Sequence, residues 1–149
     1  MGPAAEFNPD KQTDLEWTRL GRCYLLADRL MSTTFQDAIV DAFIQKIIDK
    51  GCSPTLVHET IYSGTARQSG MRRLLVDIAI FEWDKDILAT RAARPACADF
   101  FKDLAVRYQE ILEKGGEQEG APYRQLQTTC QYHDHGQDEE CCRMMFEYI

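Results

Sequence analysis

Residues 71–83, with the sequence MRRLLVDIAIFEW, decide the fold class of this chain. As a helix, the stretch carries apolar side chains on two faces, which is typical of a central helix. A buried strand is the competing interpretation for residues 74–81, because Val, Ile and Phe favour sheets. The rest of the sequence offers no partner strand, so we predict a helix. Arg73 and Asp77 lie four residues apart on it, and we expect them to pair on its surface.

Apolar residues spaced three or four apart predict further helices on both sides of this one. These helices are expected over residues 14–31, 34–50, 54–62 and 95–114. Thr34 and Asp37 form a capping-box-like start for the second helix, and Gly51 suits its left-handed end. Ser53-Pro54 is a start signal for the third. Residues 84–95 are predicted to be a connector with at most one turn of helix.

Together these segments predict an all-α bundle of about five helices with a polar C-terminal arm. A length of 149 residues suits one domain. We divide the chain into a disordered or vector-derived N-terminus (1–13), a helical domain (14–114) and an acidic C-terminal arm (115–149). The arm holds seven acidic residues against two arginines, and so carries most of the net charge of −7.

The overall charge and the absence of targeting signals limit the classes of function. A net charge of −7 disfavours nucleic-acid binding, and Arg67, Arg72 and Arg73 form the only dense basic group. We expect these arginines on a solvated or salt-bridging helix face. No apolar run approaches the ~18 residues of a membrane span, and the first ten residues do not resemble a secretory signal. The six cysteines are therefore expected to be reduced thiols in an intracellular protein, cytoplasmic or nuclear.

The C-terminal arm contains the one cluster that suggests chemistry beyond packing. Cys130 and His133 are separated by two residues, His135 lies two further on, and Cys141 follows a glycine-containing loop long enough to return. This set can supply the four ligands of a tetrahedral zinc site, with Cys142 as a spare candidate. We predict a structural zinc ion, because four protein ligands leave no open position for a substrate. The alternative is that both histidines are surface residues and the cysteines are incidental.

No organised catalytic site is visible in the sequence. It contains no phosphate-binding loop, no nucleophile elbow and no metalloprotease helix. His58 is followed by Glu59 but lacks the second histidine of such a helix, so we expect a partly buried or surface side chain there. Carboxylates are numerous, but no pair is marked as an acid–base couple. We therefore predict that the chain is not an enzyme.

Several runs of sequence follow one another in a characteristic order. They are YLLADRL (24–30), TFQDAIVDA (34–42), IYSGT (61–65) leading into MRRLLVD (71–77), DFFKDLA (99–105), and the closing Cys130-x-Tyr132-His133-x-His135. In this order and spacing they resemble the helical C-terminal part of fungal BTB/POZ-domain proteins. The β-rich half that begins the BTB fold has no counterpart, so the usual dimer surface is not carried over. The resemblance implies a protein–protein interaction scaffold or adaptor.

These observations favour a non-catalytic helical protein–protein interaction module with a zinc-bound arm. If the first two helices normally lean on a sheet that is missing here, they expose apolar surface, which predicts a homodimer or a domain swap. The alternative function is a zinc-stabilised binding domain that recognises nucleic acid or another ligand. Other partners are expected to be proteins, and their identity does not follow from the sequence.

Overall fold

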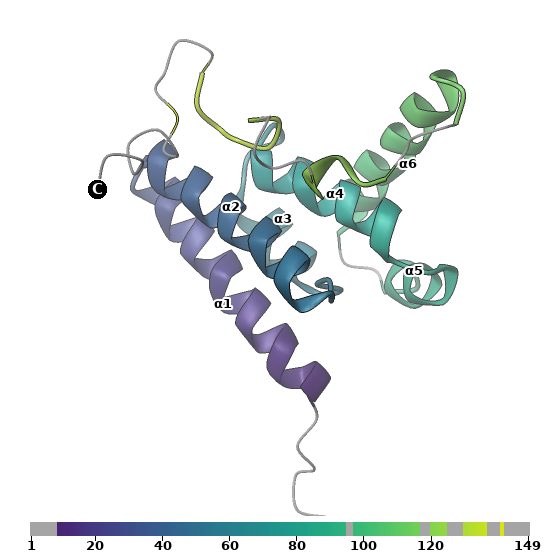
Figure 1. Ribbon diagram of the computed structural model, residues 1–149, viewed down its shortest axis with the longest axis horizontal. Helices are drawn as coiled ribbons and strands as arrows, with labels where there is room; N and C mark the ends of the chain where they lie inside the picture. The colour runs from purple at the N-terminus through teal and green to yellow at the C-terminus, as the bar shows by residue number, and fades with distance from the viewer. Residues whose placement is uncertain (1–8, 95–96, 117–119, 125–129, 137–140, 142–149) are drawn as a thin grey trace, which may run out of the picture.

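The computed structural model describes residues 9–94, 97–116, 120–124, 130–136 and 141 (Figure 1). This part of the chain folds into six α-helices and contains no strand, so the predicted all-α architecture is confirmed. The helices are α1 (Pro9–Arg29), α2 (Thr33–Lys50), α3 (Val57–Gly64), α4 (Gly70–Glu82), α5 (Lys85–Ala92) and α6 (Ala98–Glu113). None of the described helices combines the length and the hydrophobicity that crossing a membrane requires.

Helix α4, which contains most of the deciding stretch, lies at the centre of the fold. It packs against α2, α3 and α6, and α1 packs against α2 and α3. Figure 1 shows α1 and α2 side by side, with α5 and α6 at the opposite end of the molecule. From Gly70 to Ala79, α4 is buried at every residue except Arg73. This burial on nearly all sides explains why the stretch has two apolar faces.

The two ends of α2 give one correct and one incorrect prediction. Gly51 has a φ of +66° and ends the helix in the left-handed conformation, as expected. The start is capped by Ser32, whose Oγ accepts a hydrogen bond from the Phe35 N–H at 3.3 Å. The predicted box of Thr34 and Asp37 does not form. Asp37 is buried, because its carboxylate points into the protein and bonds the C-terminal segment.

Other helix boundaries also differ from the sequence expectation. Helix α1 begins at Pro9, earlier than predicted. Helix α3 begins at Val57, because buried Pro54 lies before the helix and its carbonyl accepts a hydrogen bond from Trp83 Nε1 at 2.9 Å. Helix α5 forms where a connector was expected, with the Asp84 carboxylate as its N-cap. These differences follow from caps and contacts that apolar spacing does not encode.

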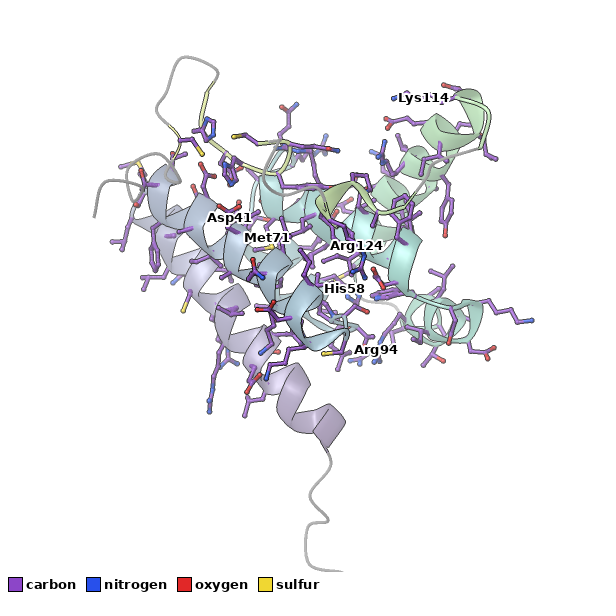
Figure 2. The ribbon with its side chains drawn as sticks, in the orientation of Figure 1. Asp41, His58, Met71, Arg94, Lys114 and Arg124 are labelled. Atoms are coloured by element: carbon purple, nitrogen blue, oxygen red, sulfur yellow. The ribbon has the colours of Figure 1, made fainter. Side chains whose placement is uncertain are left out.

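His58 is a core residue, more deeply buried than expected. Figure 2 shows it in the interior of the bundle, and it is only 3% exposed. Its ring centroid lies 4.5 Å from that of Phe100 and 5.4 Å from that of Trp83. Burial, followed by the positive charges of Arg91 and Arg94, lowers the pKa of His58 to about 4. The ring is therefore neutral at pH 7 and packs as one member of an aromatic cluster.

Candidate metal centre

Residues 130–136 lie beside the N-terminal halves of α2 and α4, where Figure 1 shows the yellow-green segment along the upper edge of the bundle. Asp134 makes most of the contacts. Its N–H donates to Asp37 Oδ1 at 2.6 Å, and its Oδ1 accepts a hydrogen bond from the Gly70 N–H at 2.7 Å. Its Oδ2 accepts a hydrogen bond from the Tyr24 hydroxyl. Three helices therefore hold this one residue.

Tyr132 provides a second attachment, on Asp77 of α4. The tyrosine hydroxyl donates to Asp77 Oδ2 at 2.5 Å, and Arg107 Nε donates to Asp77 Oδ1 at 2.8 Å. The predicted surface pair of Arg73 and Asp77 is therefore wrong, because Asp77 faces inward and is only 3% exposed. Arg73 donates to backbone carbonyls instead, two of them in residues 130–136.

Gly70 marks the place where the backbone of this segment touches α4. A Cβ atom added to Gly70 would lie 1.9 Å from the carbonyl oxygen of Tyr132 and 3.3 Å from Asp134 Oδ1. Since real Cβ contacts essentially never fall below 3.0 Å, any side chain here would push the segment away. The absence of a side chain at Gly70 thus permits the close approach.

This attachment brings the four predicted ligands together. Cys130, His133, His135 and Cys141 each offer one ligand atom, and these atoms all lie within 4.8 Å of one another. The two Sγ atoms are 3.7 Å apart, and Cys141 Sγ is 3.5 Å from His133 Nδ1. The cluster could therefore bind a metal ion. Cys142, the spare candidate, lies outside the described residues.

The hydrogen bond of His133 leaves its other ring nitrogen available for a metal. His133 Nε2 is 2.7 Å from Oδ1 of Asp41, which Figure 2 shows on α2 close to the C-terminal segment. A carboxylate oxygen accepts, so we assign the proton to Nε2 and the lone pair to Nδ1, the atom nearest Cys141. Carboxylates commonly orient metal-binding histidines in this way.

The hydrogen bond of His135 also leaves one ring nitrogen available for a metal, but in this residue it is Nε2 and not Nδ1. His135 Nδ1 is 2.8 Å from the carbonyl oxygen of Gly136, which can only accept, so Nδ1 carries the proton. Nε2 then has a lone pair, and it is buried with no hydrogen-bond partner among the described residues. Leaving such a buried acceptor unsatisfied costs about 1–3 kcal/mol. A metal ion at the cluster would satisfy it.

The polar groups behind the cluster are shielded from water. Burial raises the pKa of Asp37, and the hydrogen bond from the Asp134 N–H opposes this effect only in part. Burial also raises the pKa of Tyr24, so its hydroxyl stays protonated and donates to Asp134. These groups therefore hold residues 130–136 in place through hydrogen bonds.

Sequence reasoning identified the four candidate ligands but not the residues that position them. Asp37 and Asp41 are four residues apart on a helix rich in apolar residues, so they share one face. This spacing could have indicated that the face contacts a polar segment. Nothing local indicates that Gly70 touches Tyr132, since this contact depends on the fold. Comparison of the chain with protein-family models, with curated proteins and with solved structures finds no match.

Proposed function

We propose that the chain is a non-catalytic helical protein–protein interaction module whose C-terminal segment is held by a structural zinc ion. One observation carries the metal assignment: two thiols and two imidazole nitrogens lie within 4.8 Å of one another. A tetrahedral zinc site with the usual bond lengths has its sulfurs about 3.8 Å apart and a sulfur and a nitrogen about 3.5 Å apart. The corresponding distances here are 3.7 and 3.5 Å.

The ligand types favour zinc over other metals. Calcium and magnesium prefer oxygen ligands, whereas a tetrahedral set of two sulfurs and two nitrogens is typical of zinc. All four positions are filled by the protein, which leaves none for a substrate, so the role we propose is structural. Thiolate ligands must also stay reduced, which supports our proposal of a cytoplasmic or nuclear location.

The interaction surface that we propose lies at the turn between α1 and α2. Leu26, Leu30, Met31 and Phe35 are all exposed there, and Met31 is 89% exposed. Several large apolar side chains left exposed around one turn are typical of a protein-binding site. It also agrees with the resemblance to BTB/POZ proteins, which implies a scaffold or adaptor. We propose a second copy of the chain as one occupant of this surface.

The metal part of the proposal predicts one zinc per chain, measured by elemental analysis after purification without chelators. Cys130→Ser is expected to remove most of this zinc, because serine is a poor zinc ligand and the three remaining ligands bind more weakly. Cys52→Ser is the matched control, since Cys52 is exposed and lies outside the cluster. A wild-type protein without zinc, or equal zinc content in the two variants, would contradict the metal assignment.

The interaction part predicts self-association of the zinc-loaded protein, measured by light scattering over a concentration series. Leu30→Glu is expected to shift the protein to a monomer, because a charge at the centre of an apolar contact must be desolvated. Leu112→Glu introduces the same charge at an equally exposed leucine on α6, and should leave the mass unchanged. A wild-type monomer at high concentration would exclude the second copy as occupant.

A further inference from the structure

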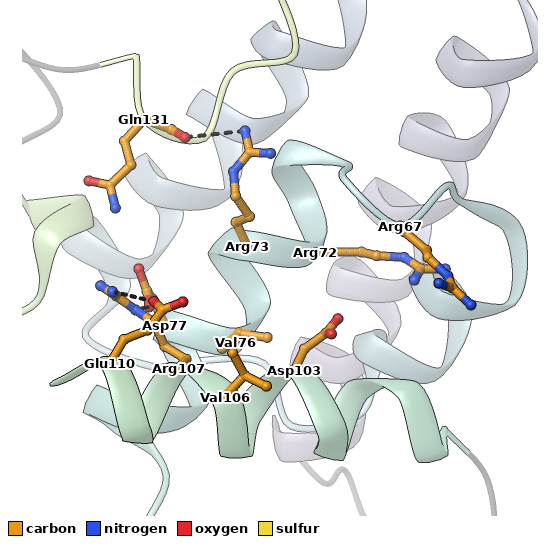
Figure 3. A pocket seen from close by; sticks show the side chains of 10 residues that line it. All are labelled: Arg67, Arg72, Arg73, Val76, Asp77, Asp103, Val106, Arg107, Glu110 and Gln131. Atoms are coloured by element: carbon orange, nitrogen blue, oxygen red, sulfur yellow. Dashed lines mark hydrogen bonds and ion pairs between the residues drawn. The ribbon is translucent and has the colours of Figure 1, made fainter. Parts of the chain in front are cut away.

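A charged pocket of about 240 Å³ lies between α4 and α6, on the side of α4 away from α1. Val76 and Val106 form its apolar floor, and Gln131 of the C-terminal segment lines its edge (Figure 3). The remaining lining residues are four arginines and three acidic residues. The distribution of these charges within the pocket indicates what it could bind.

Arg72 brings a buried positive charge to the pocket wall. It is only 7% exposed, and its hydrogen-bond acceptors among the described residues are neutral. Its Nε donates to Thr65 Oγ1 at 2.8 Å, and its Nη2 donates to the carbonyl oxygens of Thr65 and Tyr62 at 2.6 and 3.2 Å. These bonds fix the guanidinium group in place without neutralising it. A buried charge with no counter-charge is costly, and an anion nearby would lower that cost.

Arg73 and Arg67 add two more positive charges that have no acidic partner among the described residues. Arg73 donates to the carbonyl oxygens of Gln68, Gln131 and His133, which are neutral as well. Arg67 is exposed at the pocket rim. No ion pair among the described residues involves Arg67, Arg72 or Arg73. The sequence expectation of a solvated or salt-bridging helix face is therefore wrong for Arg72, which is neither.

The acidic residues do not balance these charges evenly. Asp77 and Glu110 both pair with Arg107, at 2.8 and 3.4 Å, and Figure 3 shows this group at one end of the pocket. Asp103 lies nearer the other end, where it accepts a hydrogen bond from the Tyr62 hydroxyl at 2.7 Å. The guanidinium groups of Arg67 and Arg72 lie together on that side, whereas that of Arg73 points toward Gln131 at the pocket edge (Figure 3). Outside the Arg107 group, the pocket lining therefore has three arginines and one carboxylate, a surplus of two positive charges in a protein whose net charge is −7.

We propose that the part of the pocket lined by Arg67, Arg72 and Arg73 binds a phosphorylated side chain of a partner protein. A phosphate monoester carries close to two negative charges at pH 7, which matches the surplus, and its three terminal oxygens suit several guanidinium donors. Arginine clusters are the usual recognition element for phosphorylated peptides. Arg72 and Arg73 are already held by carbonyls, so little side-chain entropy is lost on binding. The inference rests on the proposed function, because it assumes a protein partner.

The test uses the full zinc-loaded chain and fluorescently labelled peptide pools in which only the central residue is fixed. One pool has phosphoserine at that position, one has serine and one has glutamate. Fluorescence anisotropy is expected to show binding of the phosphoserine pool that is reversed by inorganic phosphate, with weaker binding of the glutamate pool and none of the serine pool. A single-stranded RNA of similar charge is measured in parallel.

Arg67→Gln is the informative variant, because Arg67 is exposed and makes no hydrogen bond or ion pair within the part of the chain that the structure describes. Loss of a charge-assisted hydrogen bond should weaken binding of the phosphoserine pool about tenfold or more. Arg22→Gln on α1 changes the net charge equally but lies outside the pocket, and should have no effect. Equal affinity of the two variants, equal binding of the phosphoserine and serine pools, or tighter Arg67-dependent binding of the RNA would each overturn the proposal.

Zinc content is measured on the same samples, which separates this proposal from the preceding one. If zinc is present at one equivalent and no phosphoserine pool binds, the phosphate pocket fails and the metal assignment stands. If zinc is absent while the phosphoserine pool binds in an Arg67-dependent way, the metal assignment fails and the pocket stands.

Discussion

Gly70→Ala is expected to lower the affinity of the chain for zinc about 100-fold while leaving the helices intact. The new Cβ would lie 1.9 Å from the carbonyl oxygen of Tyr132, so residues 130–136 must move away from α4. That movement breaks the hydrogen bonds of Gly70 with Asp134 and of Tyr132 with Asp77. Together these are worth about 3 kcal/mol, which corresponds to a factor of about 100 in affinity.

Competition with a zinc chelator of known affinity would measure this effect, and circular dichroism would report the helical content. Within a helix, alanine is more favourable than glycine by about 1 kcal/mol. Helix propensity alone would therefore stabilise α4, so it cannot account for weaker zinc binding. Gly64→Ala is the matched control, since the atoms nearest its added Cβ belong to the Leu25 side chain, which can move. Unchanged zinc affinity in Gly70→Ala would show that the segment does not need this contact.

Asp77→Ala is expected to destabilise the protein by about 3–5 kcal/mol, because it removes the acceptor of two separate elements. Arg107 of α6 and Tyr132 of the C-terminal segment both donate to this carboxylate, which is only 3% exposed. Without it, a mostly buried guanidinium group loses its closest counter-charge. A loss of this size is a large fraction of the total stability of a typical domain.

Urea unfolding of the zinc-saturated protein would measure the loss. Asp49→Ala provides the control, since Asp49 is exposed and only accepts a hydrogen bond from Gln45, so its effect should stay within about 0.5 kcal/mol. The double variant Arg107→Leu/Asp77→Ala should lose less stability than the sum of the two single variants, because it leaves neither charge buried without its partner. Additive effects would mean that the two residues do not stabilise each other.

The parts of the fold that sequence predicts well are those set by local chemistry. Gly51 ends α2 because its left-handed conformation is open to glycine at little cost, whatever surrounds it. The helical state of residues 71–83 followed from apolar spacing and from the lack of a partner strand in the sequence. The start of α3 and the length of α5, where only a turn of helix was expected, differ from the prediction, because buried Pro54 and the cap at Asp84 outweigh weak periodicity.

In the candidate site, too, local sequence predicts the ligands but not the contacts that depend on the fold. Spacing alone predicted Cys130, His133, His135 and Cys141, since a chelating loop must bring its ligands together over a short stretch of chain. The contacts of Asp41 and Gly70 with this segment could not be predicted, because both residues are separated from it by more than 50 residues and meet it only after folding. The predicted pair of Arg73 and Asp77 is wrong for the same reason, since helical spacing cannot show that Asp77 turns toward α6 and that Arg73 donates to backbone carbonyls.

Arg73 contributes to both candidate sites, because it lines the pocket and also donates a hydrogen bond to the carbonyl oxygen of His133. Thermodynamic reciprocity then applies. If an occupant of the pocket draws Arg73 toward itself and alters how firmly the metal is held, loading the metal must alter the affinity for that occupant by the same factor. If both proposed ligands bind, this shared arginine is the residue through which zinc and the pocket occupant would affect each other's affinity.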